Sequence, residues 1–232
     1  ARCYCSQLRT DPGLQIVFTG SSVLDIHKGV SDLSRRASMY HMQGLSFREY
    51  LNMFHGYDFR TYTLDEILHL KLEFPSDFRP LQYFSGYLKQ GYYPFPKNNY
   101  ENQLLQIVNV TIESDIPQYA GMNVSTARKL KQLLAVISKS VPFKPNMSNL
   151  ASVLNVSRNS IADYCLYIEE AGMIAQLRDD TGGIRGLGKV DKIYLDNTNL
   201  IYALGKEDSE IGNIRETFFF NQLRVNHDVI TS

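Results

Sequence analysis

The side chains best suited to chemistry lie in two short runs, residues 19–22 and 35–36. The first run contributes the hydroxyls of Thr19, Ser21 and Ser22, which can hold a phosphate or orient an attacking water. The second contributes the guanidinium groups of Arg35 and Arg36, and an arginine can act as a finger on the charge that develops on a γ-phosphate. A solvated arginine pair beside an ordinary turn explains the same residues, and the spacing by itself favours that simpler interpretation.

These side chains need a scaffold that brings them to one place. The run Gln15–Phe18 precedes the hydroxyls, and a short apolar run bounded by turn residues is typical of a strand buried in a parallel α/β sheet. Ligands of such sheets bind beyond the carboxyl ends of the strands, which is where residues 19–22 stand in this interpretation. The alternation of Met39–Met42 predicts a second strand. The patterns therefore predict an α/β fold for this part of the chain.

From residue 46 onward the patterns are mainly helical. Ser46 with Glu49, and Thr63 with Glu66, form capping boxes, in which each side chain satisfies a free backbone amide at a helix start. We predict further helices over residues 81–89, 102–112 and 126–137, the first closed by Gly91 in the left-handed conformation.

The segment 141–206 has the pattern of a winged helix. A short helix over residues 147–154 is followed by a turn, and Ser157 caps a longer helix in which apolar residues recur at i, i+3, i+4 and i+7. Gly172 ends that helix. Two strands, over residues 173–177 and 192–195, are joined by a glycine-rich loop. A last helix over residues 211–225 is expected to have no partner in this chain.

A helix-turn-helix suggests DNA as a partner, with residues 157–170 as the recognition helix. Arg158 on that helix and Arg185 and Lys189 on the wing are the residues suited to phosphate contacts. Six basic residues between positions 143 and 205 are, however, opposed by seven acidic ones, and phosphate neutralisation supplies most non-specific affinity for DNA. Packing or partner contact explains this segment at least as well. The basic face Arg128–Lys131 of an earlier helix is most simply solvated surface.

The overall composition excludes several classes of protein. Lys and Arg number 24, as do Asp and Glu, so no global field attracts nucleic acid or an anionic membrane. The cysteines Cys3, Cys5 and Cys165 have no zinc-ligand spacing, so we expect no metal site and reduced thiols in a cytoplasmic protein. The absence of an apolar run of about 20 residues argues against a membrane span. Because no initiating Met precedes Ala1, we expect a fragment.

The glycine-rich loop Gly183–Val190 spells all but the last letter of a P-loop, G-x-x-x-x-G-K-[ST]. Val190 lacks the hydroxyl that binds magnesium, and a strand follows the loop where the motif requires a helix. The wing of a winged helix accounts for its glycines better.

Several runs occur in a fixed order along the sequence: V-F-T-G-S-S at Val17–Ser22, L-S-R-R-A at Leu33–Ala37, L-S-F-R-E-Y-L at Leu45–Leu51, Y-L-K-Q-G-Y-Y-P at Tyr87–Pro94, S-R-N-S-I at Ser157–Ile161, K-I-Y-L-D-N at Lys192–Asn197 and G-N-I-R-E-T-F at Gly212–Phe218. In this order they resemble a prokaryotic AAA+-type P-loop ATPase family that ends in a winged helix and a PD-(D/E)XK nuclease-like domain.

The resemblance implies roles for individual residues. Ser21 or Ser22 matches the family's γ-phosphate sensor, and Arg36 matches its arginine finger, with Arg35 in place of the usual glycine. Glu216 matches the first acid of the nuclease-like fold, but the other metal-binding elements are absent. Neither Walker motif is present, so ATP and Mg²⁺ are expected in an intact parent protein, and this chain alone is expected to be inactive.

The predicted fold class is thus α/β plus mainly α: late strands of a parallel P-loop core in residues 1–56, a helical lid in 57–140, a winged helix in 141–206 and the start of a nuclease-like domain in 207–232. The predicted function is that of a portion of an AAA+-type ATP-binding protein, with a homo-oligomer and DNA as candidate partners and no membrane. The alternative is a winged-helix regulator that binds nucleic acid without ATPase activity.

Overall fold

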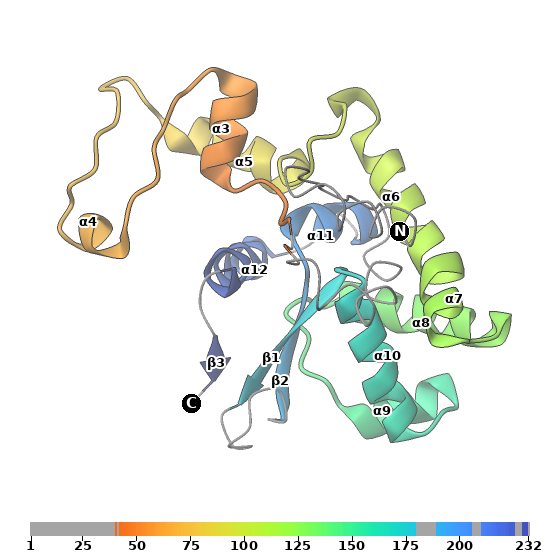
Figure 1. Ribbon diagram of the computed structural model, residues 1–232. Helices are drawn as coiled ribbons and strands as arrows, with labels where there is room; N and C mark the ends of the chain where they lie inside the picture. The colour runs from red at the N-terminus through yellow and green to blue at the C-terminus, as the bar shows by residue number, and fades with distance from the viewer. Residues whose placement is uncertain (1–39, 41, 180–188, 206–209, 226–228, 232) are drawn as a thin grey trace, which may run out of the picture.

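The computed structural model describes residues 40, 42–179, 189–205, 210–225 and 229–231, and most of them are helical (Figure 1). The α-helices are α3 (Phe47–His55), α4 (Leu64–Leu68), α5 (Pro80–Gln90), α6 (Tyr100–Val110), α7 (Ile116–Ala120), α8 (Val124–Ser138), α9 (Met147–Leu154), α10 (Arg158–Glu170), α11 (Thr198–Leu204) and α12 (Ile211–Arg224). A 3₁₀ turn, η1 (Lys97–Asn99), precedes α6, and a π-helical turn, η2 (Thr111–Asp115), joins α6 to α7. The strands are β1 (Ile174–Asp179), β2 (Val190–Leu195) and β3 (Ile230–Thr231).

The sheet is built on an antiparallel hairpin. Strands β1 and β2 pair from Ile174 opposite Leu195 as far as Arg178 opposite Val190, with an irregularity after Leu177. The two-residue strand β3 adds to the other edge of β1 in parallel, which gives the order β2-β1-β3.

The predicted fold class is therefore wrong. No parallel sheet of a P-loop core exists among the described residues, which are mostly helical and contain the β1–β2 hairpin instead. Gln15–Phe18, the first predicted strand, lies outside the described residues. Of the second predicted strand, Tyr40 and Met42 are described; they are 89% and 94% exposed and belong to no strand. A short apolar or alternating run does not by itself distinguish a strand from other segments of the chain.

The helix signals were more reliable. Ser46 caps α3 and Thr63 caps α4, each with its reciprocal glutamate, as predicted. Ser157 caps α10, whose predicted apolar positions are all buried, and α8, α9, β1 and β2 lie within a few residues of their predicted ranges. Gly91 ends α5, but not in the left-handed conformation: its φ is −115°. A glycine fits there because a Cβ would lie 2.5 Å from the Tyr87 ring.

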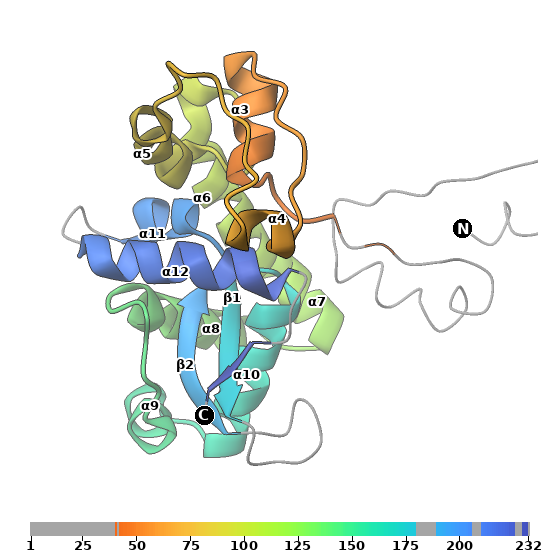
Figure 2. The ribbon, with the colours of Figure 1, turned by 90° about the vertical axis from the view of Figure 1, so that its left-hand side faces the viewer.

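The hairpin is buried on both faces, with alternate residues facing opposite ways. Ile174, Ile193 and Leu195 belong to the main core, which also contains residues from α3, α5, α6, α8, α9, α10 and α11. Ala175, Leu177 and Tyr194 form a second cluster with Phe220 of α12, whose ring stacks on Tyr194 with centroids 4.2 Å apart. Figure 2 shows α12 lying across the end of the hairpin.

Helix α12 also packs against α5. The ring of Phe218 lies 4.9 Å from Phe84 and 5.9 Å from Tyr87, measured between centroids. The prediction that this helix lacks a partner is thus wrong. A short pattern could not show these partners on α5, because they lie more than a hundred positions earlier in the chain.

Helix α3 is held on α5 by a cluster of aromatic rings around His55. Its ring lies 5.0 Å from Tyr50 and 4.6 Å from Tyr83, and its Nε2 atom is buried without a hydrogen-bond partner among the described residues. Burial, together with the positive charge of Lys97, lowers the pKa of His55. The folded chain therefore favours the neutral ring.

This arrangement predicts a loss of stability in mild acid. A histidine whose folded pKa lies below its unfolded value stabilises the fold above about pH 6.5, and this stabilisation disappears as the pH falls through the folded pKa. Between about pH 7.5 and pH 5.5, the wild-type chain should lose more unfolding free energy than His55→Phe, by less than about 1 kcal/mol because water screens the half-buried ring. Urea unfolding at both pH values measures this difference. Equal losses in the two proteins would contradict the assignment.

Candidate functional site

The residues predicted to act on a phosphate, Thr19, Ser21, Ser22, Arg35 and Arg36, all lie outside the described residues, as does Arg185. Of the residues predicted to bind DNA, Arg158 is the first residue of α10 and is exposed, and Lys189 is exposed just before β2. The side chains of Arg158 and Lys189, both in the described part of the chain, are not joined to each other by a hydrogen bond or an ion pair.

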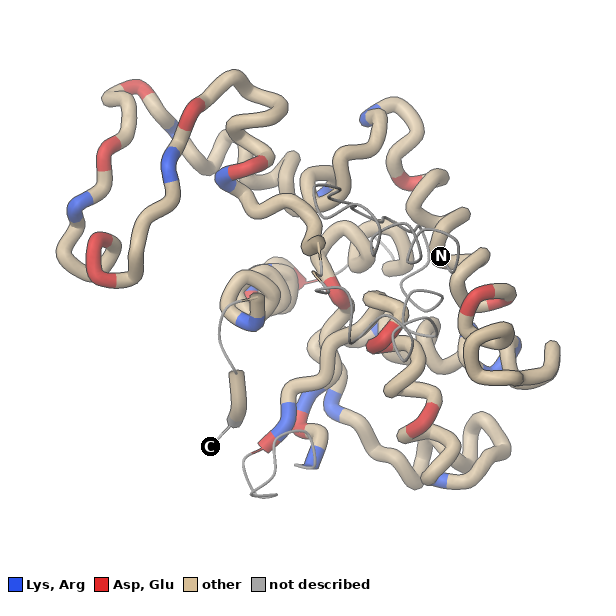
Figure 3. The backbone as a smooth tube through the Cα atoms, viewed as in Figure 1, with Lys and Arg blue, Asp and Glu red and all other residues tan. Residues whose placement is uncertain are grey.

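Basic groups near the hairpin are matched by acids (Figure 3). Lys192 donates to Glu216 at 2.8 Å, and Arg178 lies 3.8 Å from Glu169. Pairing of this kind lowers the positive charge that a DNA surface requires. DNA binding stays a prediction.

Glu216 holds α12 on the hairpin. Its Oε1 atom accepts hydrogen bonds from Lys192 Nζ and from the Tyr194 hydroxyl, each at 2.8 Å. Burial and the bond to Glu216 raise the pKa of Tyr194. The carboxylate predicted to open a nuclease-like fold thus has a structural contact in this chain, and the described residues contain no group of His, Cys, Asp and Glu that could hold a metal ion.

Sequence reasoning missed a buried polar cluster, Asp196–Asn199, which consists of the two residues between β2 and α11 and the first two residues of α11; it is called here the 196–199 loop. Its four residues are between 1% and 8% exposed, although every one of them is polar. Buried polar groups are normally hydrogen-bonded, and a group left without a partner costs free energy. The structure meets this requirement with partners far along the chain.

Asn199 and Thr198 bond to the end of α5. The Asn199 amide nitrogen donates to the carbonyls of Leu88 at 2.7 Å and Tyr87 at 3.1 Å, and the Thr198 hydroxyl donates to Leu88 at 2.8 Å. The last carbonyls of a helix have no partner within it, so these side chains act as a distant cap for α5.

The same amide holds the chain just after α5. Asn199 Oδ1 accepts a hydrogen bond from the Tyr92 backbone amide at 2.8 Å and one from the buried Tyr100 hydroxyl. The Tyr100 hydroxyl in turn accepts from the Tyr93 amide at 3.1 Å. One asparagine side chain thereby uses all of its polar atoms to join α5, α6 and the segment between them.

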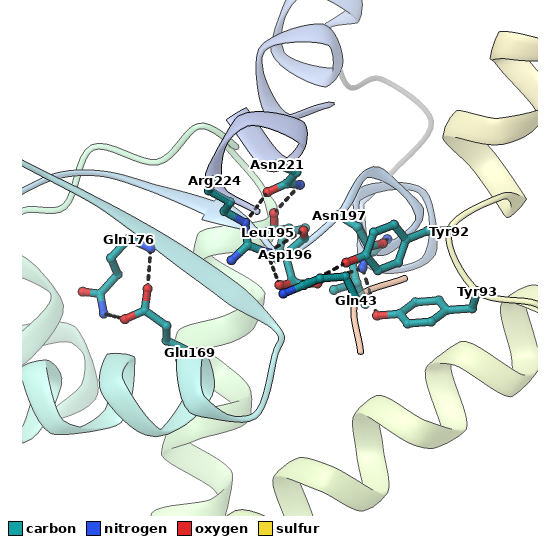
Figure 4. Close-up of polar contacts among 11 residues, drawn as sticks. Gln43, Tyr92, Tyr93, Glu169, Gln176, Leu195, Asp196, Asn197, Asn221 and Arg224 are labelled. Atoms are coloured by element: carbon teal, nitrogen blue, oxygen red, sulfur yellow. Dashed lines mark hydrogen bonds and ion pairs between the residues drawn. The ribbon is translucent and has the colours of Figure 1, made fainter. Parts of the chain in front are cut away.

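Asp196 connects the loop to α12 (Figure 4). Its carboxylate forms an ion pair with Arg224, whose guanidinium also donates to the Asp196 carbonyl at 3.2 Å and to the Asn221 side chain at 3.1 Å. On the other side, Asn197 donates to the Tyr93 hydroxyl at 2.9 Å.

The tyrosines of this site stay protonated. Burial, followed by the negative charge of Asp196, raises the pKa of Tyr92 to about 12, and the same two causes raise the pKa of Tyr93. Burial also raises the pKa of the Cys165 thiol to about 12. These groups are therefore poor nucleophiles and general bases near neutral pH. The arrangement is suited to holding elements together.

Tyr92 carries the connection to the segment before α3. Its carbonyl accepts from the Leu45 amide at 2.7 Å, its hydroxyl contacts the Gln43 side chain at 3.4 Å, and the Tyr87 hydroxyl donates to the Leu45 carbonyl at 2.8 Å. The Tyr92 ring also packs closely on Gly44, because a Cβ added to Gly44 would lie 2.2 Å from the ring. Residues 43–45, the 196–199 loop and α12 are thus linked through continuous hydrogen bonds.

The sequence contained a signal for this loop. Asp196–Asn199 is a polar run directly after an apolar strand, the same pattern that drew attention to residues 19–22. The pattern locates the loop, but it gives no information on whether the side chains face a ligand or other parts of the chain.

Replacement of Asn199 by alanine tests the importance of the loop. The change removes the acceptor of the Tyr92 amide and of the Tyr100 hydroxyl, and it removes one of the donors to the carbonyls at the end of α5. We therefore expect the free energy of unfolding to fall by roughly 3 kcal/mol. Asn159→Ala, on the exposed side of α10, is the matched control and should change it by less than about 0.5 kcal/mol. Urea unfolding monitored by circular dichroism measures both. Similar small effects for the two variants would contradict the role of Asn199.

A comparison with known proteins adds a family. The sequence model of the family described as a domain of unknown function (DUF8612) matches residues 81–210, which include α5, the Tyr92–Tyr100 segment and the 196–199 loop. No curated protein and no solved structure matches the chain. The described residues contain no helix that is both long and apolar enough to cross a membrane.

Proposed function

Because the chain belongs to the family described as a domain of unknown function (DUF8612), whose description assigns no activity, we propose a function from geometry and sequence: it is the carboxyl-terminal, motion-transmitting part of an AAA+-type ATP-hydrolysing protein. In this proposal ATP and Mg²⁺ are cofactors of the parent protein and bind outside this sequence, which contains neither Walker motif. We place the parent in the cytoplasm as part of the same proposal.

The proposal rests on the hydrogen bonds that connect residues 43–45, through Tyr92, to the 196–199 loop. Arg36, the proposed arginine finger, precedes Gln43 by seven residues. In this proposal, a displacement on ATP hydrolysis is passed to Leu45. The Leu45 amide is bonded to the Tyr92 carbonyl, and the Tyr92 amide is bonded to Asn199. Asp196 of the same loop forms an ion pair with Arg224 of α12. Packed elements joined in this way move together, as transmission of a nucleotide signal requires.

The catalytic half of the proposal is tested in the intact parent protein. We expect Arg36→Ala to reduce ATP turnover about a thousandfold while the affinity for nucleotide is retained, because a finger acts on the charge of the transition state. Steady-state phosphate release and equilibrium binding of a fluorescent ATP analogue measure the two quantities. Arg158→Ala, an exposed arginine on α10, is the control and should leave turnover unchanged. Undiminished turnover in Arg36→Ala would refute the assignment.

The transmission half is tested at Gly44. A valine there must displace the Tyr92 ring, so in Gly44→Val we expect the difference in hydrogen exchange of α12 between the ATP and ADP states of the parent to disappear. Gly212→Val is the matched control, since no atom lies within 4 Å of a Cβ added at that position. If the hydrogen exchange of α12 still differs between the ATP and ADP states in Gly44→Val, transmission through the contact of Gly44 with Tyr92 is contradicted.

A further inference from the structure

Residues 57–79 form an arm that extends from the rest of the molecule, with α4 at its end (Figures 1 and 2). The rings of Tyr57, Phe59, Phe74 and Phe78 pack on one another at its base, with centroids 4.8–5.6 Å apart. The base is anchored to α5 by a hydrogen bond of 3.0 Å between the hydroxyls of Tyr57 and Tyr83.

The end of the arm has a fixed structure of its own. Arg60 donates to Glu66 at 2.8 Å, and that hydrogen bond, with those from Thr63, lowers the pKa of Glu66 to about 2. The Arg60 guanidinium also lies 4.0 Å from the centre of the Tyr62 ring. An ordered arm loses little conformational entropy on binding, which favours association.

This ordered arm carries a concentration of exposed apolar side chains. Leu64, Ile67, Leu68, Leu70 and Phe74 are 63%, 47%, 71%, 82% and 49% exposed. Leu70 also has a φ of +53°, a conformation that is costly for a leucine. Clustered apolar exposure on an ordered element is typical of a protein–protein contact.

Charge indicates what covers the arm. The arm, residues 57–79, contains five acidic and three basic residues. Asp58, Glu73 and Asp77 are exposed, as are Lys71 and Arg79. Helix α8 and the two residues after it are the opposite: residues 124–140 contain four basic residues and no acid. Arg128 and Lys139 are exposed on one side of this segment, and Lys131, between them, forms an ion pair with Glu113 at 2.7 Å. Val124, at the start of this face, is 74% exposed. The arm and α8 lie on opposite sides of the molecule (Figure 1), so an arm cannot reach α8 of its own chain.

We propose that the arm of one copy docks on the basic face of α8 in a second copy. The apolar end of the arm supplies buried area, and the opposite charges orient the contact. Because the two surfaces are different patches, the contact is head-to-tail, and successive copies form a ring or an open chain. This inference does not depend on the proposed ATPase function.

Sedimentation velocity of the full chain over a range of concentrations tests the proposal. We expect reversible self-association that weakens between about 50 mM and 500 mM salt, since the screening length shortens from about 14 Å to about 4 Å. Leu68→Asp should raise the dissociation constant at least about tenfold. Leu81→Asp, which replaces a leucine 79% exposed on α5 outside the arm, is the matched control and should leave it unchanged.

A charge exchange identifies the opposing surface. Arg128→Glu and Glu73→Lys should each weaken association, and the double variant should recover most of the affinity of the wild type. A chain that remains monomeric up to about 1 mM would overturn the proposal. So would equal effects of Leu68→Asp and Leu81→Asp, or additive weakening in the double variant.

Discussion

The side chain of Asn199 holds together parts of the chain that are about a hundred residues apart. Its amide nitrogen bonds to carbonyls at the end of α5, and its oxygen accepts from the Tyr92 amide and the Tyr100 hydroxyl. The side chain is 1% exposed, so water cannot replace these partners if they separate. In a protein interior, the loss of one partner leaves the other unsatisfied.

Two further contacts extend the same constraint. Asp196 pairs with Arg224, and Glu216 accepts from Lys192 and Tyr194, so α12 is fixed at two points to β2 and to the loop that follows it. Glu169 joins α10 to β1 through both the backbone amide and the side chain of Gln176, each at 2.7 Å (Figure 4). The hairpin therefore lies between two sets of helices that are bonded to it. Such an arrangement is suited to transmitting a displacement, and the polar groups of this region bond to one another and to the backbone.

Local sequence signals predicted local structure well. The capping boxes at Ser46 and Thr63 and the buried stripe of α10 depend on residues three or four positions apart, so the sequence contains all the partners. The 196–199 loop and the packing of α12 depend on partners distant in the sequence, from α5, the segment after it and the hairpin, which no short pattern can identify. Gly91 shows the same difference. The sequence predicts that it ends α5, but a glycine is needed there because the Tyr87 ring lies close to it, and not because the backbone is left-handed. The residues proposed to sense phosphate lie outside the described part of the chain, so their roles stay predictions.

Native-state hydrogen exchange of the full chain at increasing, sub-denaturing urea concentrations tests the central claim most directly. If the 196–199 loop joins its neighbours into one unit, the amides of Leu45, Tyr92 and Leu200 should share a single opening free energy with the hairpin amides. These three amides bond to Tyr92, Asn199 and Asn197, respectively, so each reports on one part of the connection. Exchange of Leu45 and Tyr92 at a much lower free energy than the hairpin would show that the segment before α3 opens independently, and would contradict the account.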